Sequence, residues 1–70
     1  MTIKAIEPVY AVKKHVGIIT IQQTLKESEL ISLYVDWVNN FTTLERFAEY
    51  YGYPIDSANY IIEKGRELMN

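Results

Sequence analysis

The first third of the chain groups its apolar residues in two short runs, at 9–12 and 18–21, that are rich in β-branched side chains. Such runs favour strands because branched side chains pack well on a pleated surface. Between them lies the polar stretch 13–17, which ends in Gly17, a residue that tolerates a positive φ angle. We therefore predict a β-hairpin within residues 1–23, with a loop that carries the polar stretch. A lone hairpin is barely stable in water, so it must pack on the rest of the chain or pair with another chain.

From Thr24 onward, apolar residues recur every three or four positions, which predicts helices. The first helix is expected to begin at a capping box of Thr24 with Glu27, or at Ser28, and to end at Asn39–Asn40, where Asn tolerates a left-handed conformation. Its apolar arc is wide for a surface helix, which indicates burial on two sides, or on one side with a partner on the other. The positions of this arc are Leu30, Ile31, Tyr34, Val35, Trp37, Val38 and Phe41.

Two further helices follow. A second capping box, Thr42 with Glu45, begins a short helix that Gly52 ends, and Pro54 then prevents its continuation. The third helix is expected over about residues 55–68. The expected inward positions are Leu44, Phe47, Ala48 and Tyr51 in the second helix, and Ala58, Ile61, Ile62, Gly65 and Leu68 in the third. The predicted fold class is α+β: one domain over residues 1–70, with an N-terminal β-hairpin packed on three helices in residues 24–70.

The last two helices have the spacing of a helix-turn-helix-like pair. Ala48 is small enough for close helix approach, Gly52 follows in the turn four positions later, and Ala58 and Ile61 offer apolar contacts on the next helix. Gly65 inside that helix indicates either a close backbone approach or a helix that frays beyond Lys64, since glycine costs about 1 kcal/mol there relative to alanine.

Composition narrows the class of protein. The chain has 70 residues, 49% of them hydrophobic, and no cysteine. It is therefore expected to rely on packing alone, without disulfides, in a reducing compartment. No apolar run approaches the roughly 18 residues that span a bilayer, and the first residues lack the apolar core of a signal peptide. We expect a cytoplasmic chain with no membrane partner.

Catalytic chemistry has little support in the sequence. The single histidine, His15, falls in the expected hairpin loop and by itself builds neither a zinc site nor a nucleophile–base pair. Glu45 and Glu49 lie one helical turn apart with Arg46 nearby, a pattern typical of a solvated helix face. No glycine-rich phosphate loop is present. We expect no enzyme activity, no catalytic residue, no cofactor and no metal.

Charge and aromatic content point instead to binding. Residues 1–26 carry four lysines against one glutamate, whereas residues 42–70 carry three basic against five acidic residues. Six tyrosines in so short a chain are unusual, and tyrosine suits interfaces because it offers a large contact area with a polar tip. Tyr34 and Tyr51 are expected in the core. The leading hypothesis is a protein-binding surface formed by Tyr50, Tyr53, Asp56, Asn59, Tyr60 and Glu63.

The alternative is a small DNA-binding regulator in which the start of the third helix enters a groove. Asn59 would pair with adenine while Lys13 and Lys14 grip the phosphate backbone from the hairpin, with Lys64 and Arg66 further along the helix. The net charge of −2 offers no general attraction for nucleic acid. A homodimer is a further hypothesis, because the wide arc of the first helix and the open hairpin edge both need cover.

A segment of the chain also resembles known sequences. Residues 36–52, Asp-Trp-Val-Asn-Asn-Phe-Thr-Thr-Leu-Glu-Arg-Phe-Ala-Glu-Tyr-Tyr-Gly, are followed by Ala58, Ile61-Ile62 and Gly65-Arg66. Together they resemble a group of small proteins of bacteriophages and other mobile elements. The resemblance covers about residues 34–67, half of the chain, and not the hairpin. It implies an origin rather than a mechanism: small phage proteins often regulate transcription or bind and block a host factor, including defence systems. It carries over no catalytic residue.

Overall fold

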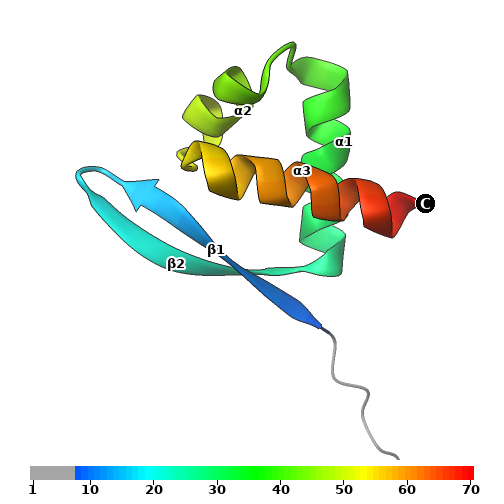
Figure 1. Cartoon of the computed structure of the whole chain (residues 1–70), viewed down its shortest axis with the longest axis horizontal. Coiled ribbons are helices and arrows are strands. Elements are labelled where there is room, and N and C mark those ends of the chain that lie inside the picture. The colour runs from blue at the N-terminus through cyan, green and yellow to red at the C-terminus, as the bar shows by residue number, and fades with distance from the viewer. Residues whose placement is uncertain (1–7) are drawn as a thin grey trace, which may run out of the picture.

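The computed structural model describes residues 8–70 and has the expected α+β architecture, an antiparallel hairpin followed by three helices (Figure 1). The elements are β1 (Val9–Val16), β2 (Ile19–Lys26), α1 (Glu27–Asn40), α2 (Leu44–Tyr51) and α3 (Ile55–Met69). The first seven residues, with one of the four N-terminal lysines and the stretch considered for a signal peptide, lie outside the described residues. The fold class is therefore confirmed.

The hairpin is longer and its turn tighter than expected. Only Gly17 and Ile18 connect the strands, and Lys13, Lys14 and His15 lie in β1 rather than in a loop. Gly17 has a φ of 63° and Ile18 has no positive φ, the pattern of a type II′ turn with glycine at its first central position. This turn matches the twist of the strands, so pairing continues to Val16 opposite Ile19 and the predicted loop is wrong.

Two of the expected helix starts are also wrong. Thr24 belongs to β2, and α1 begins at Glu27, where the Lys26 N–H donates to the Glu29 carboxylate over 3.0 Å. At α2 the cap is Thr43, whose hydroxyl accepts from the Arg46 N–H at 3.2 Å. The strand pairing takes up Thr24, so only the reciprocal, carboxylate half of a capping box remains at α1.

The helix ends agree with the prediction. α1 ends at Asn40, although the turn that follows is extended rather than left-handed. Gly52 closes α2 with a φ of 77°, and α3 starts at Ile55. Ala48, Ala58 and Ile61 are buried, as the helix-turn-helix spacing requires.

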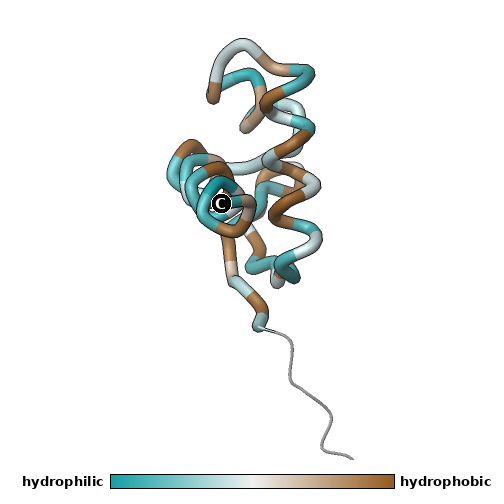
Figure 2. Tube along the Cα trace, turned by 90° about the vertical axis from the view of Figure 1, so that its right-hand side faces the viewer, coloured by the Kyte–Doolittle hydropathy of each residue, from teal (hydrophilic) through white to brown (hydrophobic). Residues whose placement is uncertain are grey.

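One core joins the hairpin to all three helices. Its buried members are Val12, Leu25, Leu30, Phe47, Ala48, Tyr53, Ala58, Ile61 and Ile62. Figure 1 shows α3 crossing α1 above the hairpin, and Figure 2 shows hydrophobic and hydrophilic positions interleaved along both helices, as expected where only one side of each is buried. Because both strands contribute to this core, the hairpin is not a separate unit.

The crossing of α1 and α3 depends on Gly65. A Cβ at this position would lie 2.4 Å from the Cβ of Tyr34 and 2.9 Å from the carbonyl oxygen of Leu30. The close-approach interpretation of Gly65 is therefore confirmed, and α3 continues to Met69 without fraying at Lys64.

The wide apolar arc of α1 is buried on one side only. Leu30 is fully buried and Tyr34, Trp37 and Phe41 pack against the core, whereas Val35 and Val38 are exposed. No helix within residues 8–70 has the length and apolarity that crossing a membrane requires.

Candidate functional site

Four of the six residues expected to bind a partner lie together on one surface of α3. Asp56, Asn59, Tyr60 and Glu63 are all exposed, and their spacing of three or four positions places them on one side of the helix. This stretch is also the beginning of the second helix of the helix-turn-helix pair. The expected grouping on α3 is thus present.

Tyr53 is not part of that surface. Its side chain is 5% exposed, with its ring stacked on Phe47 at 6.5 Å and its hydroxyl donating to Gln23 Oε1 at 2.7 Å. Burial raises the pKa of the Tyr53 phenol, with a smaller contribution from the nearby Glu29 carboxylate. The left-handed turn at Gly52 directs the chain back over the hairpin, and the expectation that Tyr53 is exposed is wrong for that reason.

Tyr50 is exposed, at 73%, but it lies elsewhere. Its ring packs edge-on against Phe41, 5.4 Å between centroids, beside a shallow recess between the α1–α2 connection and α2. This recess is lined by Asn40, Phe41, Thr42, Arg46, Glu49 and Tyr50. None of these residues lines the recess at the start of α3, so the structure does not bring Tyr50 together with Asp56 and Tyr60.

The hairpin instead supplies the neighbours of the α3 residues. The His15 N–H donates to the Gly52 carbonyl oxygen at 2.6 Å, and the Lys13 N–H donates to the Ser57 hydroxyl at 3.2 Å. A Cβ on Gly52 would lie 3.1 Å from the carbonyl oxygen of His15, so glycine is needed there both for its φ and for the approach of β1. These contacts fix the outer edge of β1 against the α2–α3 turn.

A shallow recess of about 420 Å³ lies along this contact. It is lined by Ala11, Val12, Lys13, Pro54, Asp56, Ser57 and Tyr60. A second recess, about 540 Å³, on the hairpin itself is lined by Ala11, Val12, Lys13, Thr20, Ile21 and Gln22. The two recesses share three residues of β1, and the second extends from them toward β2. We define the β1–α3 face as the exposed residues of the first recess together with two exposed residues on the same side of α3. Its members are Ala11, Lys13, Asp56 and Tyr60 at the recess, and Asn59 and Glu63 on the helix.

The charges of the β1–α3 face are mixed. Lys13 is exposed at the same recess as Asp56, and Glu63 adds a second carboxylate two turns further along α3. No ion pair joins Lys13 to a carboxylate within residues 8–70. The face therefore offers a cation, two anions, an amide and a phenol to a partner in solution.

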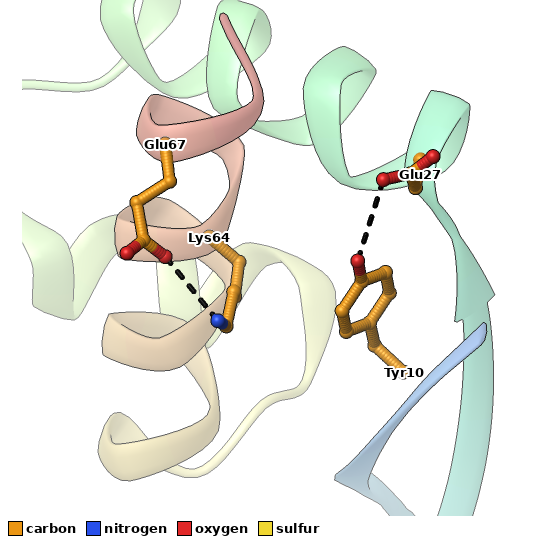
Figure 3. A network of polar contacts seen from close by, with 4 residues as sticks. All are labelled: Tyr10, Glu27, Lys64 and Glu67. Carbon is orange, nitrogen blue, oxygen red and sulfur yellow. Dashed lines mark hydrogen bonds and ion pairs between the residues drawn. The ribbon is translucent and has the colours of Figure 1, made fainter. Parts of the chain in front are cut away.

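The cations expected to grip DNA are scattered. Lys13 and Lys14 are consecutive strand residues and so point to opposite faces of the hairpin. Lys14 lies over the ring of Tyr53, 5.5 Å from its centroid. Lys64 is paired with Glu67 at 3.3 Å, a hydrogen bond that raises the pKa of the lysine. Figure 3 shows this pair within α3, next to Tyr10 of β1, which donates to Glu27 at 3.4 Å.

The polar pair with the largest pKa effect joins α2 to α1. The Tyr51 hydroxyl donates to the Asp36 carboxylate, and this bond, together with burial, raises the pKa of Tyr51 to about 12. The pair links α2 to α1 and keeps the phenol neutral. Among the described residues no three His, Asp or Glu side chains are placed to hold a metal ion.

The sequence did not reveal that Lys13 meets Asp56 and Tyr60, and Ala11, Pro54 and Ser57 were missed as members of the site. The residues of β1 and α3 are more than forty positions apart, and no local pattern records their contact. A hairpin prediction that extended the strand period through residues 13–15 would have separated Lys13 from Lys14. Comparison of the chain with protein-family models, with curated proteins and with solved structures finds no match.

Proposed function

We propose that this chain is a non-enzymatic protein-binding domain that occupies a surface of a partner protein with its β1–α3 face. The observation that carries the proposal is the meeting of Lys13, Asp56 and Tyr60 at one open recess. Tyrosine is enriched among the residues that dominate binding energy, and charges of both signs around it are typical of a polar interface rim.

The same observation argues against a phosphate backbone as the ligand. Nonspecific nucleic-acid affinity comes from several Lys or Arg side chains that neutralise phosphates together. On the β1–α3 face Lys13 is accompanied by Asp56 and Glu63, whose carboxylates would face a polyanion. Of the remaining cations of the DNA-binding hypothesis, Lys14 points to the opposite face of the hairpin and Lys64 is paired with Glu67. Arg66 is exposed on α3 one turn beyond Glu63, so Lys13 and Arg66 only balance the two carboxylates and leave no excess of positive charge.

The charges of the β1–α3 face also indicate which charges a partner surface should carry. Two carboxylates on α3 and one ammonium on β1 complement a surface with basic groups beside a smaller acidic one. The resemblance of residues 34–67 to small proteins of phages and mobile elements makes a host protein the partner that we propose. Occupation of its surface would inhibit that protein, whether it is a regulatory or a defence factor.

Paired affinity purification tests the proposal. The wild-type chain and Tyr60→Ala are immobilised side by side and exposed to lysate of the natural host cells. The proteins that each retains are identified by mass spectrometry. We expect a protein retained by the wild type to bind the purified Tyr60→Ala or Asp56→Lys chain at least tenfold more weakly, because both changes remove a central contact.

Tyr50→Ala is the matched control, since Tyr50 is more exposed than Tyr60 but lies at the other recess. Its affinity should stay within twofold of wild type. Equal retention by wild type and Tyr60→Ala would contradict the assignment of the face. Salt-dependent binding of duplex DNA below about 10 µM at physiological salt, lost on replacement of Lys13 and Lys14, would instead support the DNA-binding alternative.

A further inference from the structure

The outer edge of β2 has unused backbone hydrogen-bonding groups. Val16 and Ile19 flank a two-residue turn and therefore form a hydrogen-bonded cross-strand pair. From this pair onward, hydrogen-bonded and non-hydrogen-bonded pairs alternate along the antiparallel ladder. The non-hydrogen-bonded pairs contain Thr20, Gln22 and Thr24 of β2. The backbone N–H and C=O groups of these three residues therefore point away from β1. None of these backbone N–H and C=O groups has a hydrogen-bond partner within residues 8–70, although the Thr20 hydroxyl bonds to the His15 ring at 3.0 Å. The equivalent N–H of Lys26 donates to Glu29.

The half of the hairpin nearest the turn also carries exposed apolar side chains. Ile18 is fully exposed, and Ile19 and Ile21 are 56% and 43% exposed. Figure 1 shows the turn reaching beyond the end of α2 and the start of α3, so the helices do not cover this part of the sheet. By the pairing register, Ile19 and Ile21 lie on the same face as the buried Leu25, which is the face toward the helices.

A recess of about 310 Å³ lies on that face at the other end of β2. It is lined by Lys14, Gln23, Leu25, Glu29, Ser32, Leu33, Tyr51 and Tyr53. Gln23 and Leu25 of β2 form its sheet side, and α1 and the α2–α3 region form the rest. A strand added along the edge of β2 would direct its helix-facing side chains toward this recess.

We propose that a second copy of this chain supplies that strand, and that two β2 strands pair antiparallel about a two-fold axis at Gln22. Thr20 of one copy then pairs with Thr24 of the other, and a four-stranded sheet results. Ile19 of each copy lies opposite Leu25 of its partner, and Ile21 opposite Gln23. The isoleucines that each copy leaves exposed are thereby placed at the recess of the other, which is the self-complementarity that a two-fold interface requires.

The backbone selects this register among the symmetric ones. Pairing about Gln22 uses the unbonded groups of Thr20, Gln22 and Thr24 and no others. Pairing about Gln23 would require the Lys26 N–H, which Glu29 already accepts. Pairing about Ile21 would place Ile18, a turn residue, opposite Thr24. Each alternative also moves Ile19 away from Leu25.

The available area sets the strength of the dimer. Ile18, Ile19 and Ile21 together expose as much surface as about two whole isoleucines. The edge residues 18–26 and the recess residues Glu29, Ser32 and Leu33 make twelve of the 63 described residues. A standard interface uses about 20–30 residues on each side, so this one falls at the small end, below about 1,200 Å² in total. We therefore expect a dimer that dissociates at micromolar concentration.

The inference does not rest on the proposed function. The β1–α3 face lies along the opposite edge of the hairpin, where β1 is bonded to the α2–α3 turn. A dimer joined through β2 would present two such faces. Self-association and partner capture are therefore measured separately, and either can fail alone.

Single-cysteine crosslinking tests the register, because the chain contains no cysteine of its own. In Gln22→Cys the two cysteines are directly opposite, about 5.5 Å between Cα atoms, which a disulfide spans. Thr20→Cys is the matched control on the same strand face, since the Cα atoms of its two copies lie about 14 Å apart. With 200 µM chain and mild oxidant, we expect Gln22→Cys to form disulfide dimers at least tenfold faster than Thr20→Cys. A mixture of Thr20→Cys with Thr24→Cys should form heterodimers rapidly.

Gln22→Pro is an independent second variant. It removes an N–H that points away from β1, so the fold is retained while the dimer bonds are lost. Wild type and the control Gln22→Ala should sediment as concentration-dependent dimers up to several hundred micromolar, and Gln22→Pro as a monomer with the same circular dichroism. A monomeric wild type over that range, or crosslinking of Thr20→Cys as fast as Gln22→Cys, would overturn the proposal.

Discussion

Along β1, the outward N–H groups of Lys13 and His15 are bonded to Ser57 and Gly52, whereas those of Thr20 and Gln22 on β2 have no acceptor within residues 8–70. The two strands are similar in length and both contribute to the core. Their edges differ because the α2–α3 turn meets only one of them. A two-stranded sheet is barely stable by itself, so one edge is used for stability and the other is left available for association.

The largest loss of stability is expected on substitution of Gly52, the residue that lets β1 approach the α2–α3 turn. Gly52→Ala should lower the free energy of unfolding by about 3 kcal/mol, because its φ is 77° and its Cβ would crowd the His15 carbonyl. Gly17→Ala is the matched control: its φ is also positive, but nothing lies within 4 Å of the added Cβ. It should cost about 1 kcal/mol. Urea denaturation of both variants measures the difference, and equal costs would show that the β1 contact contributes nothing.

Proline substitution compares the two edges directly. His15 and Thr20 are cross-strand partners, and both N–H groups point away from the neighbouring strand. His15→Pro removes the 2.6 Å bond to Gly52 and should destabilise the chain by about 2 kcal/mol. Thr20→Pro removes no backbone bond. Both variants lose the exposed 3.0 Å hydrogen bond between the Thr20 hydroxyl and the His15 ring, so Thr20→Pro should cost less than about 1 kcal/mol. Thermal unfolding at low micromolar concentration, where the monomer dominates, checks this. A larger loss for Thr20→Pro would reverse the assignment of the edges.

A smaller loss of stability is expected at the hydrogen bond between Tyr53, which follows Gly52 in the α2–α3 turn, and Gln23 on the helix-facing side of β2. Tyr53→Phe removes the hydrogen bond to Gln23 but keeps the buried ring, and should cost about 1 kcal/mol. Tyr50→Phe, in an exposed ring that makes no such bond, should stay within about 0.5 kcal/mol of wild type. Urea denaturation at pH 7 distinguishes them. An unchanged Tyr53→Phe would mean that the hydroxyl is equally well bonded to water.

The smallest loss of stability is expected at the Tyr51–Asp36 bond, which joins two helices and involves neither strand edge. The pKa of Tyr51 is raised to about 12 in the folded chain, against about 10 when unfolded. Its stabilisation is therefore complete below pH 10 and is lost as the pH rises toward 12. Tyr51→Phe should be less stable than wild type by under about 1 kcal/mol at pH 8, and the gap should narrow at pH 11. A gap that is constant between these pH values would contradict the pKa assignment.

Local sequence patterns determined most of the elements. Apolar periodicity and glycine placement predicted the hairpin, three helices, the end of α1 at Asn40 and the stop at Gly52. Gly65 indicated either a close crossing or a fraying helix, and the contact with Tyr34 decides for the crossing. These signals are reliable because helix periodicity and left-handed glycine conformations are properties of neighbouring residues. The cap position shifted by two residues at α1, because strand pairing takes up Thr24, and by one residue at α2, from Thr42 to Thr43.

The tertiary structure alone decided which polar residues meet. Tyr53 is buried because Gln23, thirty positions away, accepts its hydroxyl. Lys13 joins Asp56 and Tyr60 because β1 is bonded to the α2–α3 turn, whereas Lys14 turns to the opposite face. Which edge of the hairpin is covered follows from the same long-range contact. Composition and spacing indicate which interactions each side chain can make. The packing of distant segments determines which of these side chains lie together on one surface.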